Sequence, residues 1–448
     1  MSTVREGQND FYLDYVTIST TRSTDQTSRE ISRLVTDFEI YEHLDKPYVT
    51  AKLLFVDTYN LVQRMDLQGG EKITLSIKPT ESDAEAREIE KSFYIEKFDV
   101  IQSEQRRVVT LSLVEDIVFV STTKNVNKSY TGSPISIVST ILEEYLSKDT
   151  LYTPDIYQGR MKVIVPNMHP LEAASWVKNR ATTSDGLPYY LFSTLASKDL
   201  YMVDLGTMLT APIMNKGTPY AYWQGITHSE LNSRYAVVQR FQANSQHNLI
   251  DLIRKGVVGS QYKYYDTLRG TDNELNFDVG KDTFSMLIDK SYFDDNQKRF
   301  NYGPDYTIDE KPIGEYQSKT FSRISSSGAY TGVGDFKTID QEFEFGGHKN
   351  AIIARSLKHF MTKTPVTIQV SGRDYILGTT KNPHLTIGNK IRVLVLDTLM
   401  DTGQDPEFDK KESGDYIIFA AKHIFSKERY DVQLLCTKLA SYLEDPEL

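Results

Sequence analysis

The tripeptide Asp401-Thr402-Gly403 has the residue types with which aspartic proteases perform acid–base catalysis. That chemistry needs two aspartates that share one proton. The sequence contains one such tripeptide, and further aspartates crowd the same stretch, namely Asp397, Asp405 and Asp409. A solvated loop accounts for this pattern better than a catalytic pair, so we predict no catalytic residue here.

Three other patterns have the residue types of ligand sites, and each lacks part of its motif. Gly332-Val333-Gly334 lacks the strand before it and the helix after it that a phosphate-binding loop needs. His348 and His359 are too far apart on one predicted helix to share a metal ion. Asp294-Asp295-Asn296 lacks the glycine and the final glutamate of a calcium loop. We therefore expect no cofactor and no metal site.

Composition argues against several classes of protein. The 51 basic residues are outnumbered by 61 acidic ones, whereas binding to nucleic-acid phosphates needs clustered Lys and Arg. The single cysteine, Cys436, leaves no partner for an intrachain disulfide and indicates a small buried residue in a strand. Residues 1–10 lack the apolar core of a secretory signal, and no run approaches the roughly 18 apolar residues of a membrane span. We expect a protein made in the cytoplasm that does not insert into a membrane.

The main signal in the chain is a duplication: the segment from Pro365 to Tyr442 repeats the segment from Leu34 to Val114. Two hairpins align without a gap, and each consists of two strand-like runs around a polar turn. Two unrelated amphipathic hairpins could also look alike, because alternating patterns are common. The matched positions are Phe93, Ile95, Ser103, Arg106, Val109 and Leu111 in the first copy and Tyr416, Ile418, Ser426, Arg429, Val432 and Leu434 in the second.

One glycine in each copy has a predicted structural role. Gly70 and Gly388 each stand two residues before a lysine that begins a run with apolar residues at every second position. That period is typical of a strand with one buried face. We predict that both glycines form the turn before the strand, where a residue without a Cβ is favoured. Valine at either position is then expected to harm assembly.

The elements around these glycines divide the chain into regions. Residues 1–120 contain five or six antiparallel strands, enough to close a small barrel. Residues 121–215 contain helices that begin at prolines and then a strand pair, which indicates an α+β insert. Residues 216–243 and 339–448 form a second, discontinuous barrel, and residues 244–338 are a Tyr-rich excursion with little periodicity. The expected fold class is mainly β with α+β: two similar antiparallel β-barrels separated by an α+β insert and an irregular excursion.

The run from Lys46 to Asp57, followed by Gly69-Gly70-Glu71 before the next strand, resembles the first tube-like barrel of baseplate hub proteins from contractile-tailed bacteriophages, especially the T-even type. The resemblance covers most of the chain outside roughly 244–345 and rests on the order of several segments. The further segments are the helix start at Gly132-Ser133-Pro134, the helix from Pro170 to Ala181, the strand from Tyr189 to Phe192, the helix from Ala351 to Met361 and the hairpin from Tyr416 to Thr437.

The resemblance implies a structural protein and not an enzyme. In this family three subunits form a ring of six similar barrels, which meets the hexameric tail tube on one side and the trimeric central spike on the other. The implied partners are two further copies of the chain (a homotrimer), the tail tube or tube-initiator protein, the spike and other baseplate proteins, with phage DNA passing through the bore. The implied location is the virion, in the baseplate of the phage tail.

Two alternatives remain at the level of sequence. The first is the hub of another contractile injection system, and genome neighbours separate it from a phage hub, because a capsid and a terminase indicate a phage. The second is a cell-wall hydrolase with its site in the middle third, where the resemblance fails. A glycosidase of that kind needs two carboxylates across a cleft, and sequence alone does not locate them among the 61 acids.

Overall fold

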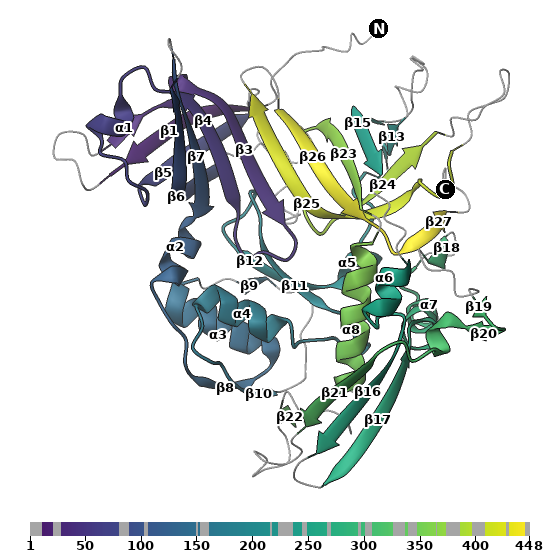
Figure 1. Ribbon diagram of the computed structural model, residues 1–448. Helices are drawn as coiled ribbons and strands as arrows, with labels where there is room; N and C mark the ends of the chain where they lie inside the picture. The colour runs from purple at the N-terminus through teal and green to yellow at the C-terminus, as the bar shows by residue number, and fades with distance from the viewer. Residues whose placement is uncertain are drawn as a thin grey trace, which may run out of the picture.

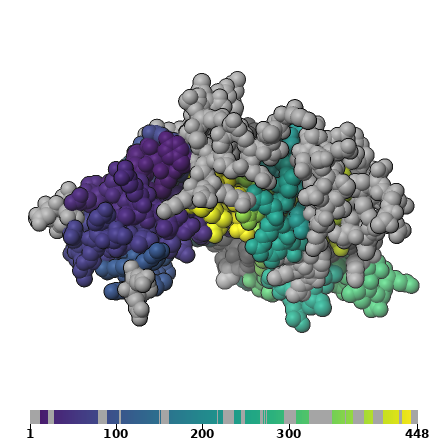
Figure 2. All heavy atoms as spheres, turned by 90° about the horizontal axis from the view of Figure 1, so that it is seen from above, coloured from purple at the N-terminus to yellow at the C-terminus, as the bar shows by residue number. Residues whose placement is uncertain are grey.

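The computed structural model of this chain has two sheet lobes side by side, with helices and a smaller sheet packed beneath them (Figure 1). Figure 2 shows the lobe of the first copy, in purple, beside the strands of the second copy. The structure describes residues 11–20, 28–79, 89–102, 106–148, 151–152, 161–215, 217–222, 236–243, 249–266, 270–293, 297–300, 307–325, 337–338, 347–363, 365–372, 386–396, 408–426 and 430–443.

The first copy forms a curved antiparallel sheet in the order β3-β4-β7-β6-β5-β1-β2. Side chains alternate along its strands, so that Ala51, Leu53 and Phe55 of β4 are buried while their neighbours are not. Ile31 closes the gap after β2 by donating its N–H to the Val16 carbonyl at 2.8 Å. The strands are β1 (Phe11–Ser19), β2 (Ser28–Glu30), β3 (Val35–His43), β4 (Thr50–Val56), β5 (Lys72–Pro79), β6 (Ile89–Gln102) and β7 (Arg107–Glu115), with a short helix α1 (Leu61–Arg64) and a 3₁₀ turn at Ser32–Leu34.

The second copy continues the same sheet, which contains 14 strands in all. Its order is β14-β13-β24-β25-β26-β23-β15, and β25 also pairs with β3, so the two copies share one sheet. Strand β13 runs parallel to β24, whereas the hairpin strands are antiparallel. The strands are β13 (Tyr220–Tyr222), β14 (Ala236–Val237), β15 (Arg240–Ala243), β23 (Val366–Ser371), β24 (Lys390–Val395), β25 (Gly414–Ser426) and β26 (Tyr430–Thr437).

The insert between the copies has a hydrophobic core of its own. Helix α3 contributes Ile137 and Ile141 to this core, and the two paired strands of the insert contribute Leu191 and Met202. Helix α3 starts where Ser133 accepts the Ser136 N–H at 3.1 Å, as its capping residues predict. The elements of the insert are α2 (Asp116–Thr122), β8 (Ser129–Gly132), α3 (Pro134–Leu146), β9 (Leu151–Tyr152), β10 (Met161–Ile164), α4 (Pro170–Lys178), β11 (Tyr189–Ser193), β12 (Leu200–Asp204) and α5 (Leu205–Thr210).

The excursion is more regular than its sequence pattern suggests, because β17, β16 and β21 form a three-stranded sheet. Helix α8 packs on this region, where Phe360 meets Phe284 edge to face with ring centroids 5.3 Å apart. The elements are α6 (Leu249–Arg254), β16 (Gly259–Asp266), β17 (Thr271–Asp278), a π-helical turn (Gly280–Phe284), α7 (Ser285–Asp289), β18 (Gln297–Phe300), β19 (Thr307–Ile308), β20 (Lys311–Pro312), a 3₁₀ turn (Ile313–Glu315), β21 (Thr320–Ser325), β22 (Lys337–Thr338) and α8 (Gly347–Met361), and β27 (Ala440–Leu443) pairs with β18.

The expected fold class is confirmed: the chain is mainly antiparallel β with an α+β insert. Within the described ranges, the strand ladders of neither copy close on themselves, and the connection between β3 and β25 takes the place of a boundary between two separate barrels. Among the described residues, no helix is long and apolar enough to cross a membrane.

Candidate functional site

The two copies match residue by residue at their hairpins. Each hairpin has a β-bulge at the same step of its register, and an unrelated hairpin has no reason to carry its extra residue there. The shared bulge position favours a structural duplication over two merely similar hairpins. The flanking pairs are Ile95–Leu113 and Lys97–Ser112 in the first copy, and Ile418–Cys436 and Ala420–Leu435 in the second.

Gly70 and Gly388 lie at equivalent places in these copies. Their φ angles are +83° and +81°, a left-handed region that residues with a Cβ rarely adopt. The Gly70 N–H donates to the Ile95 carbonyl at 2.7 Å, and the Gly388 N–H donates to the Ile418 carbonyl at 2.8 Å. Both bonds reach the residue just before the bulge, so each glycine connects its turn to the hairpin.

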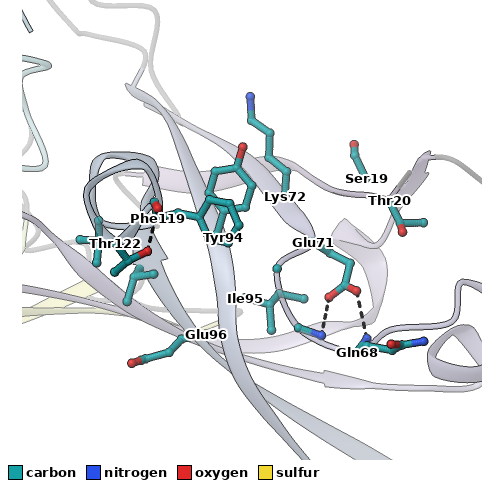
Figure 3. Close-up of a pocket in the computed structure, with 14 residues that line it drawn as sticks. Ser19, Thr20, Gln68, Glu71, Lys72, Tyr94, Ile95, Glu96, Phe119 and Thr122 are labelled. Carbon is teal, nitrogen blue, oxygen red and sulfur yellow. Dashed lines mark hydrogen bonds between the residues drawn. The ribbon is translucent and has the colours of Figure 1, made fainter. Parts of the chain in front are cut away.

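The surroundings of the two glycines differ. A Cβ on Gly388 would lie 3.5 to 3.9 Å from Phe192, Leu44 and Met208, which fill the space beside that turn. Beside Gly70 lies an open cavity of about 890 Å³ (Figure 3). Phe119, on the cavity wall, is 43% exposed. The turn of the second copy therefore packs against three side chains, whereas a Cβ on Gly70 would meet Phe119 at 3.7 Å and the turn of the first copy borders the open cavity.

The turn at Gly70 is held open by the carboxylate of Glu71. This carboxylate accepts the backbone N–H groups of Gln68 at 2.9 Å and Gly69 at 3.0 Å (Figure 3). Carboxylates make strong bonds with backbone N–H donors, and Glu71 is itself buried. These two bonds hold the backbone of the turn that lines the cavity.

The junction between the copies is an antiparallel ladder from β3 to β25. It runs from Asp37 opposite Ser426 to His43 opposite Ala420. The Leu44 N–H then donates to the Phe419 carbonyl at 2.8 Å. An edge of the first copy thus covers an edge of the second, and this protects both from pairing elsewhere.

A buried polar cluster crosses this junction. His423 Nε2 lies 3.1 Å from Glu42 Oε2, and His423 Nδ1 lies 2.8 Å from the Tyr430 hydroxyl. The second oxygen of Glu42 accepts the Leu195 N–H from the insert. Burial, with a contribution from Glu42, raises the pKa of Tyr430 well above its usual value. Because the side chains of His423 and Glu42 are fully buried, the cluster ties both copies and the insert together.

Each copy also has its own buried ion pair. Lys91 Nζ lies 2.9 Å from Glu115 in the first copy, and Arg392 Nε lies 2.8 Å from Asp415 in the second. Burial acts to raise the pKa of Glu115. The nearby Lys91 ammonium and the hydrogen bonds that the Glu115 carboxylate accepts outweigh that effect, so the pKa of Glu115 is lowered. Both pairs lie in the interior of their lobes.

Most of the candidate sites considered on sequence grounds lie where the structure does not describe the chain. Asp401, Gly332-Val333-Gly334 and Asp294-Asp295-Asn296 lie outside the described residues. His348 and His359 are both on α8. In the described part of the chain, no group of three or more His, Cys, Asp or Glu side chains could hold a metal ion.

Comparison with known proteins finds similarity in structure only. No family model and no curated protein matches the sequence. The tail protein from Neisseria meningitidis MC58 has a TM-score of 0.51 at 10% identity, and the match covers 96% of this chain and 98% of that chain. The 43 kDa tail protein of prophage MuSo2 from Shewanella oneidensis has a TM-score of 0.50 at 10% identity, and the match covers 97% of this chain and 99% of that chain. The resemblance to phage tail proteins indicated by the ordered sequence segments is thus confirmed at the level of fold.

Proposed function

We propose that this chain is the structural baseplate hub of a phage tail and that three copies form its ring. The observation that carries the proposal is the duplication, in which two lobes share a bulge position and a glycine turn. Three chains with two similar lobes each present six similar units around a threefold axis. Such a ring fits a hexameric tail tube on one face and a trimeric central spike on the other.

The shared fold of the two tail proteins supports this assignment over nearly the whole chain. The partners that follow are two further copies of the chain, the tail tube or its initiator, the spike and other baseplate proteins. DNA passes through the bore without being bound, since a chain with a net charge of −10 attracts it little. The location is the baseplate of the virion.

We also keep the four sequence regions as the domain division: 1–120, 121–215, 216–243 with 339–448, and 244–338. The separate core of the insert supports the second region. The ladder between β3 and β25 makes the first and third regions a structural unit that should unfold together.

Mass photometry of the purified chain, followed by electron microscopy with and without the spike, tests the assembly. We expect a mass of three chains and a ring with six similar units. A monomer at micromolar concentration that stays monomeric when the spike is added would overturn the proposal.

The hub is proposed to be non-enzymatic, and this claim has its own test. Purified cell walls incubated with the chain should show no clearing beyond buffer. Clearing that is lost when acids between Asp266 and Asp340 are replaced would instead establish a hydrolase. Genome neighbours then distinguish a phage from another contractile injection system.

A further inference from the structure

The intrachain junction of β3 with β25 has a candidate counterpart between β15 and β6, and these two described strands do not pair with each other within one chain. Strand β15 corresponds to β3, because each lies beside the equivalent strand of its own copy in the same register. The equivalence starts from the two matched hairpins, in which Leu111 of the first copy corresponds to Leu434 of the second. Leu111 pairs with Leu53 of β4, and Leu434 pairs with Ile368 of β23, so β4 and β23 correspond. Leu53 in turn pairs with Phe38 of β3, and Ile368 pairs with Phe241 of β15.

The edge that β3 covers on β25 corresponds to the second half of β6, from Lys97 to Gln102. In the second copy this edge is protected, and His423 is fully buried there. In the first copy β5 accompanies β6 only as far as Tyr94, and within the described residues β7 is the one strand beside Lys97 to Gln102. Val100, the counterpart of His423, is 37% exposed, and Ile101 is 64% exposed.

The cavity beside Gly70 belongs to the same unfilled surface. In the second copy Leu44, which directly follows β3, packs beside Gly388 and donates to the Phe419 carbonyl. The counterpart of Phe419 is Glu96, which lines the cavity of the first copy (Figure 3). Among the described residues, the first copy therefore has a strand edge without a neighbouring strand and a hollow at the end of that edge, whereas both places are occupied in the second copy.

We propose that β15 of one subunit pairs antiparallel with the Lys97–Gln102 edge of β6 in the next subunit, in the register of the intrachain junction. Phe241 then lies opposite Gln102, and Ala243 lies opposite Val100. Strand β15 has a ladder with β23 on one side, and its Arg240 and Ala243 are exposed. Because donor and acceptor edges lie on the same chain, the contact is head to tail and repeats until the ring closes. The number of subunits in that ring rests on the proposed function, whereas the register does not.

A second copy of this chain fits this edge better than an unrelated peptide. The intrachain junction shows that this sheet already accepts such a strand, from the equivalent position and in a defined register. The new junction has Val100 in place of His423 and Asp99 in place of Lys422, so the contacts of His423 with Glu42 and of Lys422 with Glu39 have no counterpart, and the exposed Val100 takes the place of the buried histidine. Exposed strand edges of this kind are sites of strand addition.

Disulfide cross-linking of the full chain tests the register. Facing residues of an antiparallel ladder have Cα atoms about 4.5 to 5.5 Å apart, which a disulfide spans. The double variant Val100→Cys with Ala243→Cys should form covalent multimers on oxidation. The native Cys436 is fully buried, and burial raises the pKa of its thiol, so it does not compete.

The matched control is Ile101→Cys with Ala243→Cys, shifted by one residue. A one-residue shift turns the side chain to the other face of the sheet, so we expect roughly tenfold less cross-linking. Equal cross-linking in the two double variants, or none in either variant of a chain that still assembles, would overturn the inference.

The native mass of the cross-linked protein separates this inference from the proposed function. In-register cross-links in a trimer support both. In-register cross-links in a particle that is not a trimer support the strand pairing and overturn the trimeric hub. A trimer in which the in-register pair fails to cross-link retains the hub and overturns the pairing.

Discussion

The two copies of the duplicated segment have the same hairpin register and the same glycine turn, yet their surroundings are opposite. In the second copy β3 covers the edge of β25, and Phe192 and Met208 pack beside Gly388. In the first copy the corresponding edge exposes Ile101, and the turn at Gly70 opens into a cavity. One copy is thus completed within the chain, whereas the other keeps an open edge among the described residues, where we propose that a second subunit binds.

The largest expected effect comes from breaking the junction that the chain already contains. His423→Ala leaves the Glu42 carboxylate buried without its partner, which should lower the free energy of unfolding by about 3 to 5 kcal/mol. Urea denaturation measures the change. The control Glu39→Ala removes the more exposed contact with Lys422 across the same strands and should cost only about 0.2 to 1 kcal/mol. Equal losses in both variants would show that the buried cluster has no special role.

Valine at the two glycines should separate folding from assembly. Gly388→Val forces a branched side chain at positive φ into packed surroundings, so the isolated chain should lose more than the roughly 1 to 3 kcal/mol that backbone strain costs. Gly70→Val incurs the same strain, but its Cβ would meet Phe119 at 3.7 Å on the wall of an open cavity, so its folding loss should stay within that range while ring formation fails. Denaturation and mass photometry distinguish the two effects. Normal trimers from both variants would contradict the role assigned to these turns.

A charge on the exposed edge of the first copy should affect assembly alone. Ile101→Asp places a carboxylate where strand addition is proposed, and the side chain is 64% exposed, so folding should change by no more than about 0.5 kcal/mol. The measurement is the oligomer mass over a dilution series. Ile164→Asp is the matched control, because Ile164 is 62% exposed on β10 of the insert. Loss of the ring in both variants would point to a general effect of added charge.

The smallest effect is a pH dependence inside the first copy. The pKa of Glu115 is lowered in the folded protein, so its stabilising contribution is fully present above the ordinary value of 4.5 and is lost as the pH falls through the lowered value. Glu115→Gln should therefore flatten the acid side of the stability profile below pH 4.5. Denaturation midpoints across that range provide the test, and an unchanged slope would mean that the ion pair with Lys91 is not the cause.

Much of the local structure follows from the sequence, since its signals lie within a few residues. Helix α3 begins at its Ser133-Pro134 cap as predicted, and the strands of both hairpins follow their alternating patterns. The sheet of β16, β17 and β21 was not foreseen, because β21 reaches β16 from more than fifty residues away and their pairing leaves no local period. Helix α2, which places Phe119 at the cavity, begins without a side-chain cap, so the sequence does not predict its start.

The sequence by itself determined the repeated pattern and the two glycines, because repeated patterns and residue types can be recognised without knowing which residues are in contact. Only the tertiary structure decided that β3 pairs with β25, that His423 meets Glu42 and that the equivalent edge of the first copy is left open. The physical reason is that strand pairing depends on which edges remain free after both lobes have folded. Edges with similar patterns are distinguished by their neighbours in space, and those neighbours come from distant parts of the chain.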